Sequence, residues 1–197
     1  MRLNHNEFNA MQGGFKEIIH KHLEMRTLKN LGLEITGKNV LEIGCGSGYG
    51  AELLSAYQPK TYLGIDLMPE QIRLAQQRNI NNSQFEVLDA TRMNQLNTPP
   101  IEEIVVFRIL HHIPEWKAVL KASAKKLSPG GSIYIIEPYR YLSKLADLFL
   151  AWQHPPEALF TTAEIREEMH QLGFATKTTS IGYGFAMQGT IASAKTD

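Results

Sequence analysis

The chain has 197 residues, of which 43% are hydrophobic and 20% are charged, a composition that supplies one buried core and excludes bulk disorder. Its 20 basic and 20 acidic side chains give a formal net charge of zero, so no broad basic surface is available for nucleic acid or an anionic membrane. The single cysteine, Cys45, excludes an internal disulfide, and the lack of a signal-like or membrane-spanning apolar stretch predicts a cytoplasmic protein.

The first half of the chain begins with a helical pattern and then alternates between strands and helices. Apolar residues at roughly helical spacing predict a helix over residues 15–31, and Gly37 interrupts the chain after it. Short apolar segments predict strands at residues 39–43, 61–66 and 85–88. Helices are expected between these strands, at residues 49–57 and 69–78. Pro69 suits the first turn of the second helix.

The second half continues this alternation and then ends differently. Strands are predicted at residues 104–110 and 132–137, with a helix at 114–126 and a turn at 128–131 between them. A helix at 161–172 follows, with Thr162 as its N-cap and Gly173 as its C-cap. Two closing strands, 174–181 and 185–193, are joined around residues 182–184. The pattern predicts an α/β fold, a doubly wound and mostly parallel sheet with helices on both faces and an antiparallel edge.

We expect a single domain over residues 1–197, with two additions to the alternating pattern. Residues 1–36 would form an N-terminal helical cap. Residues 139–160 form an insertion between a strand and a helix, and we interpret them as a lid-like segment, because insertions at the carboxyl ends of strands often cover the ligand crevice. The insertion is aromatic, which fits either a pocket for an apolar small molecule or ordinary packing; its aromatic residues are Tyr139, Tyr141, Phe149, Trp152 and Phe160.

The segment "NVLEIGCGSGYG", residues 39–50, places a series of glycines directly after a predicted strand. Glycine loops at such a position let the backbone approach a ligand closely, and dinucleotide-binding proteins use the spacing Gly-x-Gly-x-x-Gly or Ala. Gly46, Gly48 and Ala51 match that spacing, whereas the register that begins at Gly44 does not. The glycines alone therefore leave a nicotinamide dinucleotide and other ligands open.

Three acidic residues near the strand ends favour an adenosine ligand with a cationic end. Glu42 precedes the glycine loop, where its carboxylate would repel a pyrophosphate and attract an ammonium or a sulfonium; the alternative is that it braces the loop. Asp66 ends the next strand, near the spacing at which an acid binds ribose hydroxyls, or it caps the following helix. Asp89 follows the third strand and could accept the amino proton of adenine, or it is an ordinary turn residue.

Five segments in order resemble the motifs of class I S-adenosylmethionine-dependent methyltransferases. They read "VLEIGCGSGYG", "YLGIDLMPEQIRLAQQR", "FEVLDA", "VVFRILHHIPE" and "LSPGGSIYIIEP". The similarity covers residues 37–138, roughly half of the chain. It implies a seven-stranded sheet in the order 3-2-1-4-5-7-6, with strand 7 antiparallel, and S-adenosyl-L-methionine as the cofactor.

The resemblance also implies which residues meet each part of the cofactor. The glycine loop would surround its methionine part, the aspartate after the second strand would bind the ribose hydroxyls, and residues 89–90 would recognise adenine. Leu67 and Met68 could pack on the adenine base, although either one alone also fits a core position. The backbone at the end of the 104–110 strand would meet the methionine amino group. The residues assigned to the cofactor are Glu42, Gly44, Cys45, Gly46, Gly48, Asp66, Leu67, Met68, Asp89, Ala90, Phe107 and Arg108.

One departure from the family pattern has a structural consequence. Members of the family often carry Ser or Thr just before the proline of the helix at 69–78. This chain has Met68 there. A methionine side chain offers no oxygen to accept the first backbone N–H groups of a helix. We therefore expect that helix to lack a side-chain cap.

Methyl transfer from a sulfonium is an in-line displacement by an already activated donor, so alignment and desolvation can supply much of the rate. A base is needed only if the acceptor must lose a proton. His112 is the candidate catalytic base, and His111 is a weaker one. Both follow the strand at 104–110, on the side where open α/β sheets bind ligands, and histidine titrates near neutrality. We predict no metal, because no acidic or Cys/His cluster in the sequence supports that pair.

We expect a small-molecule acceptor, lipid-like or quinone-like metabolites included, and no nucleic acid. The segment "VVFRILHH" lacks the Pro-Pro-aromatic motif that amino-methylating DNA enzymes carry at this place. Two alternatives stay open. The first is an NAD(P)-dependent oxidoreductase that uses the register from Gly46. The second is a non-catalytic S-adenosylmethionine-binding protein, since the cofactor and acceptor sites are separate. The sequence predicts neither the methylated atom nor the oligomeric state.

Overall fold

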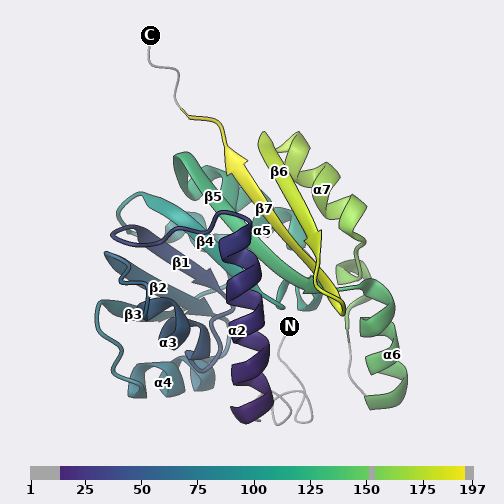
Figure 1. Ribbon diagram of the computed structural model, residues 1–197, viewed down its shortest axis with the longest axis horizontal. Coiled ribbons are helices and arrows are strands. Elements are labelled where there is room, and N and C mark those ends of the chain that lie inside the picture. The colour runs from purple at the N-terminus through teal and green to yellow at the C-terminus, as the bar shows by residue number, and fades with distance from the viewer. Residues whose placement is uncertain (1–13, 151–153, 194–197) are drawn as a thin grey trace.

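The computed structural model describes residues 14–150 and 154–193. Within them, a seven-stranded sheet in the order β3-β2-β1-β4-β5-β7-β6 forms the centre of the molecule (Figure 1). The strands from β1 to β5 pair in parallel, while β7 pairs antiparallel with both β5 and β6. The predicted α/β class and the sheet order that the resemblance implies are both confirmed. The strands are β1 (Asn39–Ile43), β2 (Thr61–Asp66), β3 (Ser83–Val87), β4 (Ile101–Phe107), β5 (Leu127–Pro138), β6 (Phe174–Ser180) and β7 (Gly184–Ile191).

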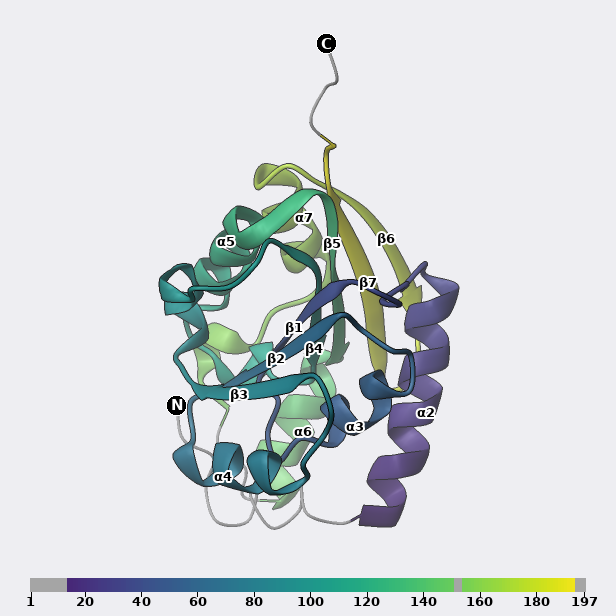
Figure 2. The same ribbon diagram turned by 90° about the vertical axis from the view of Figure 1, so that its left-hand side faces the viewer.

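Helices cover both faces of the sheet, and Figure 2 shows α2 and α5 on opposite sides of it. Six α-helices are described: α2 (Gly14–Asn30), α3 (Tyr49–Ser55), α4 (Pro69–Gln77), α5 (Trp116–Lys126), α6 (Arg140–Leu150) and α7 (Thr162–Gln171). Three short 3₁₀ helices lie in the connections: η1 (Ala90–Gln95), η2 (Leu110–His112) and η3 (Pro156–Ala158). No helix among the described residues is long and apolar enough to cross a membrane.

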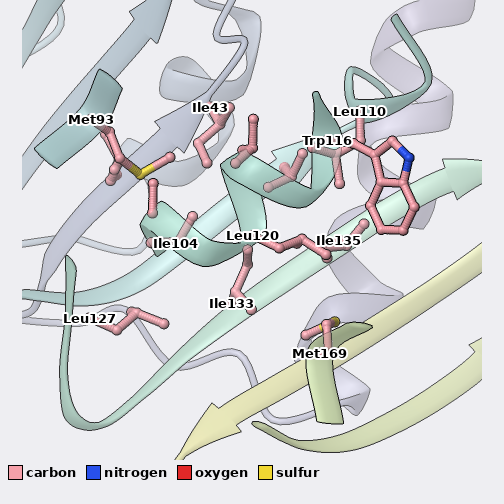
Figure 3. Packing of buried hydrophobic residues seen from close by; sticks show 14 of the residues in the cluster. Ile43, Met93, Ile104, Leu110, Trp116, Leu120, Leu127, Ile133, Ile135 and Met169 are labelled. Carbon is pink, nitrogen blue, oxygen red and sulfur yellow. The ribbon is translucent and has the colours of Figure 1, made fainter. Parts of the chain in front are cut away.

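The central strands send alternate side chains into two apolar clusters, one on each face of the sheet. Leu41 and Ile43 of β1 belong to the cluster that also holds Trp116 of α5 and Met169 of α7 (Figure 3). Val40, which precedes Leu41 and therefore points to the opposite face of the sheet, belongs to the other cluster, together with residues of α2 and α3. A strand that is apolar on both faces is what the middle of a parallel sheet requires. This is why "NVLEI" shows no alternation of polar and apolar residues.

The two segments predicted to add to the domain lie on different parts of the sheet. In the described part of residues 1–36, Met25 and Leu28 of α2 are buried in the second cluster. In residues 139–160, α6 follows the carboxyl end of β5 and extends away from the sheet (Figure 1). A lid function for this segment stays a prediction.

The aromatic residues of the insertion divide between packing and exposure. Phe160 is buried and its ring centroid lies 5.1 Å from that of Trp116, so it belongs to the core. Tyr141 and Phe149 are exposed. Trp152 lies outside the described residues.

Two predictions around β4 and β5 were wrong. The strand predicted at 104–110 runs from Ile101 to Phe107, because Arg108 adopts a left-handed conformation with φ 52° and ends it. The turn predicted at 128–131 lies inside β5, which pairs with β4 on both sides of a register shift. Proline and glycine there mark an irregularity in a strand rather than its beginning.

The caps of two helices follow local chemistry. Thr161, and not the predicted Thr162, is the N-cap of α7, because its hydroxyl accepts from the N–H of Glu164 while that glutamate accepts from the N–H of Thr161. At the other end Leu172 is the C-cap, and Gly173 follows it with φ 88°. Met68 is the N-cap of α4 without a side-chain hydrogen bond, as predicted.

Candidate functional site

A cleft opens at the carboxyl ends of β1 to β4, where open α/β sheets bind ligands. It holds about 850 Å³ of space that no protein atom fills, and part of this space is open to solvent. Most of the residues assigned from the sequence line it. They are Gly44, Gly46, Asp66, Leu67, Met68, Asp89, Ala90, Phe107 and Arg108, together with His112. Glu42, Cys45 and Gly48 are not among the lining residues.

The glycine loop follows β1 as a tight turn and packs against the residues that follow β4. Gly44 has φ 69°, a conformation that L side chains rarely adopt. A Cβ at this position would also lie 2.5 Å from Cγ1 of Ile109. Only glycine therefore lets the loop lie against the residues that follow β4, and both Gly44 and Ile109 line the cleft.

Glu42 is buried beneath the glycine loop. Its Oε2 accepts a hydrogen bond of 2.6 Å from the Tyr62 hydroxyl. Burial and the nearby charge of Glu42 raise the pKa of Tyr62 well above its usual value, so the phenol stays protonated and donates. Gly50 lies so close that a Cβ there would collide with the carboxylate. The bond to Tyr62 ties Glu42 to β2, and both its bracing of the loop and its contact with a cofactor stay predictions.

Asp66 ties the glycine loop to the start of α4 from the end of β2. Its Oδ2 accepts from the Gly46 N–H at 3.0 Å, and its Oδ1 accepts from the Met68 N–H at 2.8 Å. Burial raises the pKa of Asp66, while backbone N–H donors, including these two, act in the opposite direction. Each carboxylate oxygen has two lone pairs, so the side chain that lines the cleft keeps acceptor capacity for a ligand.

Asp89 caps the short helix η1 at the end of the cleft beside β3. Its Oδ1 accepts from both the N–H and the hydroxyl of Thr91, at 2.9 and 2.8 Å. Both bonds go to one oxygen. Among the described residues, the other oxygen accepts no further hydrogen bond, so its lone pairs remain available in the cleft, which Asp89 and Ala90 both line.

Arg108 connects the wall of the cleft to distant parts of the chain. Its N–H donates to the carbonyl of Ile136 at 2.8 Å, and its Nε lies 3.3 Å from Oε1 of the buried Glu24 in α2. The Tyr183 hydroxyl donates to the same oxygen. Burial and the charge of Glu24 raise the pKa of Tyr183. The left-handed backbone at the end of β4 is thus held by α2 and by the turn before β7.

Glu137 shapes the loop after β4, and reasoning from the sequence missed it. It is fully buried at the end of β5. Its Oε1 accepts from the N–H groups of Ile109 and Leu110, at 2.9 and 2.8 Å. Its Oε2 lies 2.5 Å from Nδ1 of His111. An acid at the carboxyl end of the strand "SIYIIE" was the available signal.

His111 and His112 are joined by a third buried histidine, His154. The ring centroids lie 4.2, 4.8 and 5.1 Å apart, and Nδ1 of His154 lies 2.6 Å from Oδ1 of Asp147. Burial, with His111 and His154 nearby, lowers the pKa of His112 to about 2. A catalytic role for His112 stays a prediction. His154 was missed because no local spacing connects "HPPE" to the "HH" pair.

Comparison with known proteins agrees with this fold. Residues 15–179 match a family model described as a methyltransferase domain. The chain is 26% identical over 106 residues to the Ubiquinone biosynthesis O-methyltransferase of Xanthomonas oryzae, covering 52% of this chain and 44% of that protein. It thus spans less than half the length of this curated relative.

Two solved structures share the architecture. One is a Haloferax volcanii methyltransferase in complex with the Trm112 methyltransferase activator, with TM-score 0.76, 17% identity, and coverage of 98% of this chain and 99% of that one. The other is an O-methyltransferase family protein from Burkholderia thailandensis, with TM-score 0.75, 19% identity, and coverage of 96% and 60%. At such identities the likeness shows the fold. With the family model matching most of its length, the chain belongs to the S-adenosylmethionine-dependent methyltransferases, whose cofactor is S-adenosyl-L-methionine.

Proposed function

We propose that this chain binds S-adenosyl-L-methionine in the cleft and transfers its methyl group to a small molecule. The observation that carries the proposal is the meeting of Asp66, Asp89 and the glycine loop around one cleft, in a chain that matches the methyltransferase family model. The cleft offers carboxylates and glycine backbone for a cationic nucleoside. This favours methyl transfer over the NAD(P)-dependent alternative.

The proposed pose of the cofactor follows from the acceptors that remain available. Asp66 would receive the ribose hydroxyls on the lone pairs that its two backbone bonds leave. Asp89 would accept the adenine amino group on the oxygen that Thr91 does not use. The methionine part would then lie by Gly44 and Gly46, towards the backbone at the end of β4.

The proposed reaction is an in-line displacement. An oxygen of the acceptor attacks the methyl carbon, the new O–C bond forms as the C–S bond breaks, and neutral S-adenosylhomocysteine leaves. The acceptor's proton passes to water or to a base. Apolar side chains of Ile43, Ile65, Ile109 and Ile113 line the cleft. These side chains exclude water from the positive charge of the sulfonium. The rate then depends on how well the acceptor oxygen is aligned with the methyl carbon.

The acceptor that we propose is a hydroxylated aromatic compound of the quinol type. The relatives that carry this name act in ubiquinone biosynthesis as O-methyltransferases, and an apolar cleft suits a flat aromatic ring. A formal net charge of zero supports a small acceptor over nucleic acid. The cytoplasmic location stays a prediction.

A methyl-transfer assay with a matched pair of variants tests this function. The chain is incubated with methyl-labelled S-adenosyl-L-methionine and a panel of catechols and quinols with tails of increasing length. We expect labelled product and equimolar S-adenosylhomocysteine. At a cofactor concentration below saturation, Asp66→Ala should lower both by about 5- to 150-fold, which corresponds to about 1–3 kcal/mol of lost cofactor binding, whereas Glu70→Ala, which removes an exposed carboxylate from α4, should change neither. Tight NAD(H) binding without S-adenosyl-L-methionine binding would contradict the proposal. Cofactor binding without transfer to any acceptor would instead support the non-catalytic alternative.

A further inference from the structure

Beyond the cofactor cleft, the three buried histidines form a cluster with the chemistry of a metal site. His111 and His112 belong to η2, and His154 precedes η3. Each offers one ring nitrogen, and the three nitrogens all lie within 4.8 Å of one another. Imidazole nitrogen is a good ligand for zinc, copper, iron and nickel ions. The fold thus brings together a ligand set that the spacing of the residues in the chain does not reveal.

Carboxylates orient two of the three rings. Glu137 Oε2 lies 2.5 Å from Nδ1 of His111, and Asp147 Oδ1 lies 2.6 Å from Nδ1 of His154. A carboxylate on one ring nitrogen fixes the tautomer and raises the basicity of the other nitrogen, an arrangement that is usual around histidine-bound zinc. Glu137 is itself held by two backbone N–H groups, so its position is fixed before any ion binds.

The third ring has an unsatisfied nitrogen. His112 is buried, and its Nδ1 has no hydrogen-bond partner among the described residues. A buried polar atom without a partner costs free energy, roughly 1–3 kcal/mol. An apolar aromatic side chain would fill the same space without that cost. A bound cation would satisfy such an atom, and it would also balance the negative charges that Glu137 and Asp147 bring to the cluster.

We propose that His111, His112 and His154 bind one divalent transition metal ion of the zinc type. Tetrahedral zinc with Zn–N bonds of about 2.0–2.1 Å places its ligand nitrogens about 3.3 Å apart. The nitrogens lie within 4.8 Å of one another, so a small inward movement of the rings completes the site. Three protein ligands leave a fourth position for water or a substrate, as in zinc sites that are catalytic.

Because the histidine cluster adjoins the cleft, a bound ion could also activate the methyl acceptor; this role rests on the proposed function. His112 both belongs to the cluster and lines the cleft. An ion there would lie beside the acceptor, and its open position would take a hydroxyl oxygen. Coordination lowers the pKa of that hydroxyl and aligns the oxygen. The proton would leave to water, and the oxygen would attack the methyl carbon.

The experiment uses the 197-residue chain without a histidine tag, stripped with a chelator and dialysed. Zn²⁺ titration by calorimetry should show one equivalent bound, and Co²⁺ should give the intense visible absorption of a tetrahedral site. His154→Gln and His111→Gln should each weaken binding at least tenfold. His22→Gln, which changes an exposed histidine of α2, should leave it unchanged. Asp147→Asn should weaken binding about 10- to 100-fold through loss of the carboxylate partner of His154.

Folding is checked separately by thermal unfolding and by S-adenosyl-L-methionine binding, both of which Asp147→Asn should leave close to wild type. Less than one equivalent of Zn²⁺ on the folded wild-type chain would overturn the site, as would equal weakening by His154→Gln and His22→Gln. Both readouts measure metal binding without methyl transfer. A chain that binds Zn²⁺ and transfers no methyl group would therefore count against the proposed function and leave the site standing.

Discussion

Replacing Asp66 by asparagine tests the carboxylate that connects the glycine loop, α4 and the proposed ribose position. In the wild type, its two oxygens accept from the N–H groups of Gly46 and Met68, at 3.0 and 2.8 Å. Asparagine has almost the same shape but only one oxygen. Its amide NH₂ group would therefore face one of the two backbone donors, and that donor would lose its partner.

The expected loss differs between stability and cofactor binding. A buried N–H left without an acceptor costs about 1–3 kcal/mol. Burial raises the pKa of Asp66, which shows that its charge is disfavoured there, and the neutral asparagine avoids this penalty. Stability should therefore fall by about 1 kcal/mol, at the low end of that range. The ribose hydroxyls lose their charged acceptor in addition, so affinity for S-adenosyl-L-methionine should fall by about 1–3 kcal/mol, or about 5- to 150-fold.

Titration calorimetry with S-adenosyl-L-methionine and urea unfolding measure the two losses on the same samples. Glu70→Gln is the matched control, because it removes the charge of an exposed carboxylate in the first turn of α4 without touching the loop. We expect this control to change neither quantity. A dissociation constant for Asp66→Asn within about twofold of wild type would refute the ribose assignment. Weaker binding caused only by unfolding would appear as a low fraction of competent protein.

Three further predictions concern the scaffold. Burial raises the pKa of Glu103 to about 7 despite Lys38, so the folded state holds the proton more tightly. The free energy of unfolding should therefore fall by up to about 3 kcal/mol as pH rises from about 4.5 past 7. Urea unfolding at pH 5 and pH 8 should show a smaller change in Glu103→Gln than in the wild type; the same change in both proteins would contradict this assignment. Gly50→Ala should collide with Glu42 and cost about 1–3 kcal/mol, read as a lower Tm. Thr161→Ala removes the capping box of α7 and should cost about 1 kcal/mol; unchanged urea midpoints would exclude either effect.

Much of the fold could be predicted because each strand–helix unit carries its own local signal. "NVLEI" is apolar on both faces because β1 lies in the middle of the sheet, between β2 and β4, and Pro69 begins α4. The order of the strands is not a local property, and the resemblance to a family supplied it. The predicted turn at 128–131 was wrong because the pairing of β5 with β4 resumes after a register shift. Composition alone does not distinguish such an irregularity from a chain reversal.

Some residues of the candidate site could be predicted from the sequence, and the roles of others could not. Asp66 ends β2 and Asp89 lies two residues after the end of β3, so the rule that ligands bind at the carboxyl ends of strands was enough to place both at the cleft. Glu42 obeys that rule too, yet the structure uses it beneath the loop, in a hydrogen bond to Tyr62. A strand-end position indicates which side of the sheet a carboxylate lies on. Whether it points to a ligand or braces the backbone depends on contacts from other strands.

The wall of the cleft after β4 depends on contacts from distant segments of the chain. Arg108 is held by Glu24 of α2, and the loop after β4 is held by Glu137 at the end of β5. His154 reaches the His111–His112 pair only because the chain returns to it after α6. The proposed donor contacts of Asp66 and Asp89 thus come from consecutive strand–loop units, whereas the residues around His112 come from segments far apart in the chain. The shared motifs lie in these strand–loop units, and this is why they identify the methyl donor and not the molecule that receives the methyl group.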